Sequence, residues 1–149
     1  MESMKLLKEN FDLMSQGRVN DMDLSKMLPF YKNMSTDIKI QRERIGGNFA
    51  IAQAVISQEM RDEIRKVLPD CIFVCLSLTK ETQMKRITAR HGSGEASEGI
   101  VKMMNDIHGM YDKPTESEKD AFNIDITEEM SQDDVLKNVM KTLKDNNLL

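Results

Sequence analysis

Two arginines four positions apart, Arg86 and Arg90, are the residues of this sequence whose type and spacing most suggest chemistry. Residues four apart lie on one face of a helix, so both guanidinium groups can reach a single anion. The planar fork of donors on arginine suits phosphate oxygens. A solvated basic face is the alternative, because Lys85 adjoins the pair, and the spacing alone leaves both readings open.

The glycine-rich stretch that follows, HGSGEASEG (91–99), does not qualify as a phosphate-binding loop. A Walker A loop needs Gly-x-x-x-x-Gly-Lys-Ser/Thr between a strand and a helix, so that backbone N–H groups surround the phosphates. This stretch follows a predicted helix, lacks Gly-Lys-Ser/Thr and carries two glutamates that repel phosphate. Gly46-Gly47 also fails, since Asn48 stands where lysine is required. The sequence contains no recognisable P-loop.

The sequence also predicts no metal site. Asp21 and Asp23 suggest a calcium loop, but an EF-hand needs glycine at its sixth position and glutamate at its twelfth. Those positions hold Lys26 and Lys32. Neither histidine has cysteine partners at the spacing of a zinc site.

The balance of 21 basic and 25 acidic side chains gives a formal net charge of −4, which argues against a nucleic-acid partner. The chain has no apolar run of membrane-spanning length and starts with charged residues, so we expect neither a membrane segment nor a signal peptide. Cys71 and Cys75 in CIFVCLSL would lie roughly 13 Å apart on one face of a strand, too far for a disulfide. Two thiols favour a cytoplasmic location.

The elements that must position these residues follow from hydrophobic spacing and from caps. We predict a helix carrying Met4, Leu7, Phe11 and Met14, and a second helix from Pro29 to Gly46-Gly47. Strands are predicted at 48–55, 71–78 and 121–127; helices at 58–68, 80–90, within 98–112 and at 132–143, with caps at Ser57, Thr79 and Ser131. The order predicts an α/β fold: a three-layer parallel sheet flanked by helices, with a helical first third, in one domain over 1–149.

Four segments, in this order, resemble the small P-loop kinases of the gluconokinase and shikimate kinase type, in the adenylate-kinase-like superfamily. LMSQGRVNDMDLSKMLPFYKNM (13–34) is similar to the substrate-side segment of that family. The stretch 49–78 is similar to its third strand, its Arg-Asp helix and its fourth strand. QMKRITARHG (83–92) resembles the start of the mobile lid, and YDKPTESEKDAFNIDIT (111–127) resembles the proline-bearing segment and last strand.

The resemblance implies roles for six residues. Arg86 and Arg90 would be lid arginines that contact ATP phosphates and stabilise the transferred phosphoryl group. Asp21, Asp23, Arg61 and Asp62 would lie on the substrate side, although the first two also suit helix caps. The family implies ATP and Mg²⁺ as cofactors, a helical substrate-side region over 1–46, an α/β portion over 47–143 and a lid near 86–114.

The chain also departs from the family pattern. The first strand, the P-loop, the first helix and a later acidic segment have no counterpart, so we expect a P-loop-kinase-like domain truncated at its N-terminus. The family places its P-loop strand between its third and fourth strands. Without the P-loop strand, three alternatives remain. The predicted strand 48–55 pairs directly with 71–78, the exposed strand edges pair with another chain, or the sequence is part of a longer protein.

Three functions follow from these expectations. The first is a kinase-derived domain related to phosphoryl transfer from ATP to a small hydroxylated metabolite, with gluconate as the nearest family substrate, and with little or no catalysis because Walker A is absent. The second is a non-catalytic module that forms a homo-oligomer through a strand edge or a Met-rich helix face. The third is an active enzyme whose phosphate site uses the lid arginines and a helix N-terminus.

Overall fold

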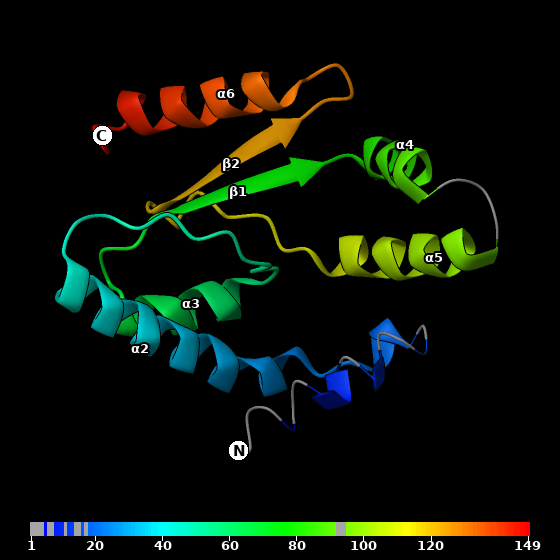
Figure 1. The fold of residues 1–149 in the computed structure, drawn as a ribbon, viewed down its shortest axis with the longest axis horizontal. Coiled ribbons are helices and arrows are strands. Elements are labelled where there is room, and N and C mark those ends of the chain that lie inside the picture. Colours follow the sequence, from blue (N-terminus) through cyan, green and yellow to red (C-terminus); the bar gives the residue numbers. More distant parts are fainter. Residues whose placement is uncertain (1–4, 6–7, 11, 14–15, 17, 92–94) are drawn as a thin grey trace. The chain divides into compact units, whose positions relative to one another are not determined.

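The computed structural model describes residues 5, 8–10, 12–13, 16, 18–91 and 95–149 (Figure 1). The predicted apolar stripe of the first helix, Met4, Leu7, Phe11 and Met14, lies outside these residues. The described elements are two 3₁₀ helices, η1 (Val19–Asp21) and η2 (Leu24–Met27); the helices α2 (Leu28–Ile45), α3 (Gln58–Val67), α4 (Lys80–His91), α5 (Glu95–Met110) and α6 (Gln132–Asp145); and the strands β1 (Phe73–Leu78) and β2 (Ala121–Ile126). The fold is therefore mixed α/β.

The chain divides into two compact units. The first contains Met1–Cys71 and Lys102–Asp112, and the second contains Ile72–Val101 and Lys113–Leu149. No helix in the described part of the chain is long and apolar enough to cross a membrane.

In the first unit α2 packs against α3, and both helices begin and end where the sequence predicts. Pro29 stands in the first turn of α2, where its missing N–H costs no hydrogen bond. The helix ends at Gly46, whose φ of +77° favours glycine. The Ser57 side chain caps α3 by accepting a hydrogen bond from the Met60 N–H. Among the described residues, the buried apolar side chains of this unit are Val19, Tyr31, Met60, Ile64 and Leu68.

The predicted strand at 48–55 is wrong. These residues adopt no regular secondary structure, and the apolar side chains of Phe49 and Ile51 are 43% and 51% exposed. One of its carbonyls, that of Ala54, accepts a hydrogen bond from the Tyr31 hydroxyl. A strand exists only where a neighbour pairs with its backbone, and within the described residues no strand pairs with this segment. The described sheet therefore has two strands where the sequence predicts three.

The second unit is built on the parallel pairing of β1 with β2, and the predictions at 71–78 and 121–127 are confirmed (Figure 1). Parallel strands cannot be joined by a tight turn, and α4 and α5 occupy the connection in sequence. The predicted caps are also confirmed. The Thr79 hydroxyl accepts a hydrogen bond from the Thr82 N–H, and the Ser131 hydroxyl accepts one from the Asp134 N–H.

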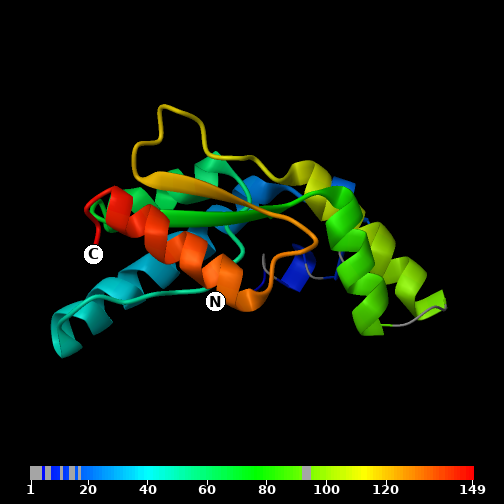
Figure 2. The ribbon, with the colours of Figure 1, turned by 90° about the horizontal axis from the view of Figure 1, so that it is seen from above.

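The two faces of this sheet differ in polarity, because successive side chains of a strand alternate between faces. In the observed register Phe73 lies beside Ala121 and Ser77 beside Asp125. One face is entirely apolar and carries Val74, Leu76, Leu78, Phe122, Ile124 and Ile126. The other face is mixed: it carries Phe73, Cys75 and Ala121 towards the start of the strands, and Ser77, Asn123 and Asp125 towards their carboxyl ends. Helix α6 contacts β2 and runs back along the sheet (Figure 1). Figure 2 shows the two strands side by side.

We expect Ser131→Ala to lower the free energy of unfolding by about 1 kcal/mol, the usual loss for an N-cap. Ser131 and Asp134 form a reciprocal capping box, in which each side chain bonds the backbone N–H of the other residue. Urea unfolding followed by circular dichroism measures the change. Ser131→Thr keeps the acceptor oxygen and is the matched control; an equal loss of stability in both variants would contradict the capping role.

Candidate functional site

The carboxyl ends of β1 and β2 lie at the same edge of the sheet, because the strands are parallel. Ligands of open α/β proteins bind outside this edge. Ser77 and Thr79 lie at the end of β1, and Asp125 and Thr127 lie at the end of β2. Polar side chains from both strands therefore meet where the fold class favours a site.

Asp125 is the centre of this group. Its Oδ1 accepts hydrogen bonds from Ser77 Oγ at 2.5 Å, from Lys113 Nζ at 2.8 Å and from Asn123 Nδ2 at 3.0 Å. The Lys113 ammonium, followed by the Ser77 and Asn123 side chains, lowers the pKa of Asp125 to about 2. We call these four residues the Asp125 cluster.

The Asp125 carboxylate is thus ionised at neutral pH and already bonded from three sides. A carboxylate with so low a pKa is a weak general base. The Asn123 amide also donates to Ser77 Oγ at 3.1 Å, so the cluster links β1 to β2 through side chains as well as backbone. The cluster therefore joins the two strands in the observed register and places Lys113 beside the carboxyl edge.

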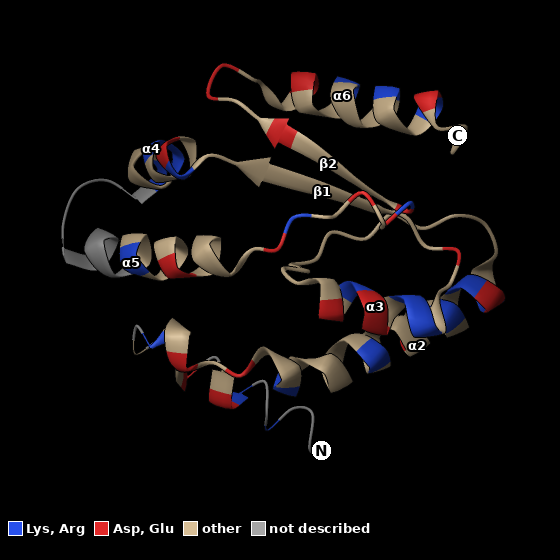
Figure 3. Cartoon of the chain, turned by 180° about the vertical axis from the view of Figure 1, so that it is seen from behind, with Lys and Arg blue, Asp and Glu red and all other residues tan. Residues whose placement is uncertain are grey.

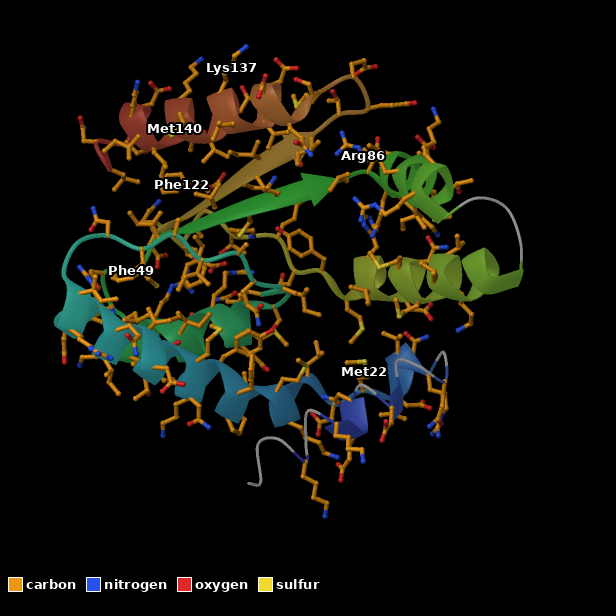
Figure 4. The ribbon with its side chains drawn as sticks, viewed as in Figure 1. Met22, Phe49, Arg86, Phe122, Lys137 and Met140 are labelled. Carbon is orange, nitrogen blue, oxygen red and sulfur yellow. The ribbon has the colours of Figure 1, made fainter. Side chains whose placement is uncertain are left out.

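Arg86 ties α4 to the loop that follows β2. Its Nη2 donates to the carbonyl oxygens of Met130 and Thr127, at 3.2 Å and 3.3 Å. One residue earlier, Lys85 forms an ion pair with Glu128 at 2.6 Å. Arg86 itself is exposed, and within the described residues its Nε and Nη1 form no hydrogen bond. Figure 4 shows its side chain near the carboxyl end of β1.

Arg90 lies one turn after Arg86 on α4 and is also exposed. The i, i+4 spacing therefore falls on a helix, as the sequence predicts. The two guanidinium groups differ in their surroundings, since Arg86 is held by two carbonyls and Arg90 forms no hydrogen bond or ion pair within the described residues. The glycines at 92 and 94 lie outside the described residues.

The substrate-side aspartates lie in the first unit and act locally. Asp21 pairs with Arg18, with 2.7 Å between Oδ2 and Nε. Asp23 caps η2 by accepting hydrogen bonds from the backbone N–H and the hydroxyl of Ser25. The Ser25 hydroxyl is the main cause that lowers the pKa of Asp23. Both carboxylates therefore shape the turn before α2.

Arg61 is fully buried, and its Nη1 donates to the Asp112 carbonyl at 2.9 Å. Asp112 meets the start of α3 in two more places: its N–H donates to the Ile56 carbonyl, and its Oδ2 accepts from the Gln58 N–H. The next residue in the predicted Arg-Asp pair, Asp62, forms an ion pair with Arg65 at 2.7 Å. In this structure Arg61 anchors the segment at 112 to α3 and presents no donor to solvent.

A shallow cavity of about 620 Å³ lies in the first unit, beside the end of α2. Its walls carry charges of both signs, and an ion pair joins Arg42 to Asp70 at 2.6 Å. The Arg42 guanidinium lowers the pKa of Asp70. The cavity is lined by Lys39, Arg42, Glu43, Gly47, Asn48, Val67, Leu68, Pro69 and Asp70.

Two expected absences concern metals and disulfides. Within the described residues, no three His, Cys, Asp or Glu side chains are grouped to hold a metal ion. Cys71 and Cys75 are both half-buried and form no disulfide. Cys71 lies before β1 and Cys75 lies within it, so only one of the two is a strand residue.

Sequence reasoning missed the Asp125 cluster. Asn123 and Asp125 alternate with apolar residues in AFNIDI, which marks a strand with one polar face. Ser77 is the polar residue near the end of an apolar run. These two signals are local to their strands. Lys113 lies outside both strands, and no spacing pattern in the sequence indicates that it pairs with Asp125.

Comparison with known proteins gives no match: no family model, no curated protein sequence and no solved structure matches the chain. The features of the chain that bear on its function are the order of its motifs, the parallel strand pair and the contacts of Arg86 and Asp125.

We expect Lys113→Met to raise the pKa of Asp125, because it removes the largest cause of the low value. A pKa lowered in the folded state stabilises the protein above the ordinary pKa of an aspartate, and this stability is lost as the pH falls towards about 2. The difference in unfolding free energy between wild type and Asp125→Asn should therefore become smaller as the pH falls from 3.8, the ordinary pKa of an aspartate, towards about 2.

Carbon-detected NMR titration of the Asp125 carboxyl measures the pKa in wild type and in Lys113→Met. Lys119→Met removes a lysine outside the cluster and is the control. An unchanged Asp125 pKa in Lys113→Met, or an equal rise in both variants, would contradict the pairing.

Proposed function

We propose that the chain is a kinase-derived α/β domain, related to enzymes that transfer a phosphoryl group from ATP to a small hydroxylated metabolite, and that it does not carry out the transfer itself. One observation supports the relationship most. The segments 71–78 and 121–127, which resemble the family's fourth and last strands, form a parallel pair, and Arg86 of the Arg-x-x-x-Arg helix bonds the loop after the second strand.

The proposed remnant of the nucleotide site is an anion contact made by Arg86 and Arg90. The carbonyls of Thr127 and Met130 hold Arg86 through Nη2, which leaves the Nε and Nη1 donors for a phosphate oxygen. Arg90, one turn away on α4, supplies a second guanidinium on the same face. Glu128, in the loop after β2, forms an ion pair with Lys85, so its charge is partly offset.

Two arginines do not replace a phosphate-binding loop. Phosphoryl transfer depends on backbone N–H groups and a lysine that position the phosphates, and on a Ser/Thr hydroxyl that holds Mg²⁺. No Gly-Lys-Ser or Gly-Lys-Thr occurs in the sequence. We therefore expect an exposed anion contact that is weak, dependent on salt concentration and unable to orient the γ-phosphate.

The substrate side supports the same proposal. Arg61 is buried against the Asp112 carbonyl, and Asp62 is paired with Arg65. Asp21 bonds Arg18, three positions before it, and Asp23 bonds Ser25, two positions after it. A small hydroxylated substrate would have to break these contacts to use the four residues that the resemblance assigns to it.

A second function, a non-catalytic interaction module, is favoured by one specific observation. Within the described residues β1 pairs with a strand on one side only, and Leu76 in the middle of β1 is 46% exposed. This module could coexist with a weak anion contact, because the open edge of β1 and the α4 arginines are different features of the second unit.

Isothermal titration with Mg-ATP tests the leading proposal. We expect a dissociation constant above about 10 μM, which corresponds to a binding free energy of roughly −7 kcal/mol, because the sequence has no P-loop motif. We also expect no ADP release in the presence of gluconate. Binding tighter than this limit, or sustained turnover, would show that the nucleotide site is intact and would contradict the proposal.

Residual anion binding can be assigned by NMR titration with tripolyphosphate at low salt. Arg90→Met should weaken this binding at least several-fold, because it removes one of the two guanidinium groups. Lys137→Met is the matched control, since Lys137 is an exposed cation on α6 that points away from the sheet (Figure 4). An equal effect of both variants would show that the binding is only nonspecific attraction.

A further inference from the structure

The backbone of β1 has one edge bonded to β2 and one edge that faces away from it. The Phe73 N–H donates to the Asp120 carbonyl at 2.8 Å, so Phe73, Cys75 and Ser77 direct their N–H and C=O groups towards β2. The alternate residues Val74, Leu76 and Leu78 direct theirs to the opposite edge. Within the described residues no strand pairs with that edge.

The two outer edges of this sheet are protected to different degrees. The outer edge of β2 carries Asn123 and Asp125, and Asp125 is joined by Lys113. Charged residues on an edge are a known protection against pairing with other chains. The β1 sequence FVCLSL has no charge, proline or glycine, and Figure 3 shows β1 without a charged residue. The β1 edge is therefore the one suited to accept a strand.

Exposed apolar side chains accompany this edge. Leu76 is 46% exposed in the middle of β1, because α6 packs on the neighbouring strand β2. On α6 itself Leu136 is 58% exposed and Met140 is 39% exposed. Figure 4 shows Met140 on the side of α6 nearer the sheet. Leu136 and Met140 lie four positions apart on α6, so they share one face of that helix.

We propose that the open edge of β1 pairs with β1 of a second copy of this chain, antiparallel and about a twofold axis at Leu76. Leu76 then lies opposite Leu76 of the second copy, and Val74 lies opposite Leu78. All three residues direct their backbone groups outward, so each opposed pair exchanges two hydrogen bonds. The result is one continuous sheet with the two β1 strands at its centre and the two β2 strands at its edges.

A second copy suits this edge because the edge is complementary to itself. In a twofold contact the same edge of both copies meets, so a charged residue at the axis would face the same charge in the second copy. Here every opposed pair is apolar, and the side chains share the apolar face of the sheet. The axis at Leu76 also covers the most exposed apolar side chain within β1.

Sedimentation velocity of the full chain over a hundredfold range of concentration tests the proposal. We expect a concentration-dependent dimer, and we expect Leu76→Lys to remain a monomer, because it sets two ammonium groups against each other at the axis. Ile40→Lys is the matched control, since Ile40 is similarly exposed, at 52%, but lies on α2. A wild-type monomer at every concentration, or dimers of all three proteins, would overturn the proposal.

Cross-linking tests the register and does not require a disruptive variant. In a Cys71→Ser, Cys75→Ser background, Leu76→Cys should form a covalent dimer under mild oxidation, because residues opposite each other in an antiparallel pair lie within disulfide distance. Lys137→Cys in the same background is the control and should remain monomeric. Failure of Leu76→Cys to cross-link while the protein sediments as a dimer would overturn the β1–β1 contact.

Discussion

The in-register parallel pairing of β1 with β2 is the constraint on which the second unit depends. Parallel pairing requires a long connection, so the chain must leave β1 through α4 and α5 before it returns as β2. It also brings both carboxyl ends to one edge, where the side chains of Ser77 and Asp125 meet across the strands. A shift of one residue would move each apolar side chain of a strand to the opposite face.

This constraint also explains the other features of the unit. With β2 fixed, the loop at 127–130 lies within reach of α4, where Arg86 and Lys85 bond it. The apolar face of the sheet receives α6 over β2, and Leu76 of β1 is left half exposed. The proposed anion contact and the open edge thus both depend on the same strand pair.

Local signals in the sequence were sufficient for much of the fold. Caps and breakers act over a few residues, so Pro29, Gly46 and the serines at 57 and 131 located the ends of α2, α3 and α6. The two true strands were recognisable from continuous or alternating apolar runs. The segment 48–55 has a similar composition and is not a strand, because strand formation depends on a distant partner that composition does not reveal.

The candidate site was harder to predict for the same reason. The spacing of Arg86 and Arg90 on a helix could be predicted, but the two carbonyls that hold Arg86 are more than forty positions away in sequence. The burial of Arg61 against Asp112 and the salt bridge from Lys113 to Asp125 are likewise contacts between distant segments. Periodicity gives the direction of a side chain on its own element and does not identify the partner.

Amide hydrogen exchange along β1, measured residue by residue by NMR, tests the central account most directly. In dilute solution the amides of Cys75 and Ser77, which face β2, should exchange slowly, and those of Leu76 and Leu78 should exchange quickly. Raising the protein concentration should slow the second pair alone. Equal protection of all four amides in dilute solution would place another strand on the open edge of the single chain, and the absence of protection at Cys75 and Ser77 would contradict the pairing of β1 with β2.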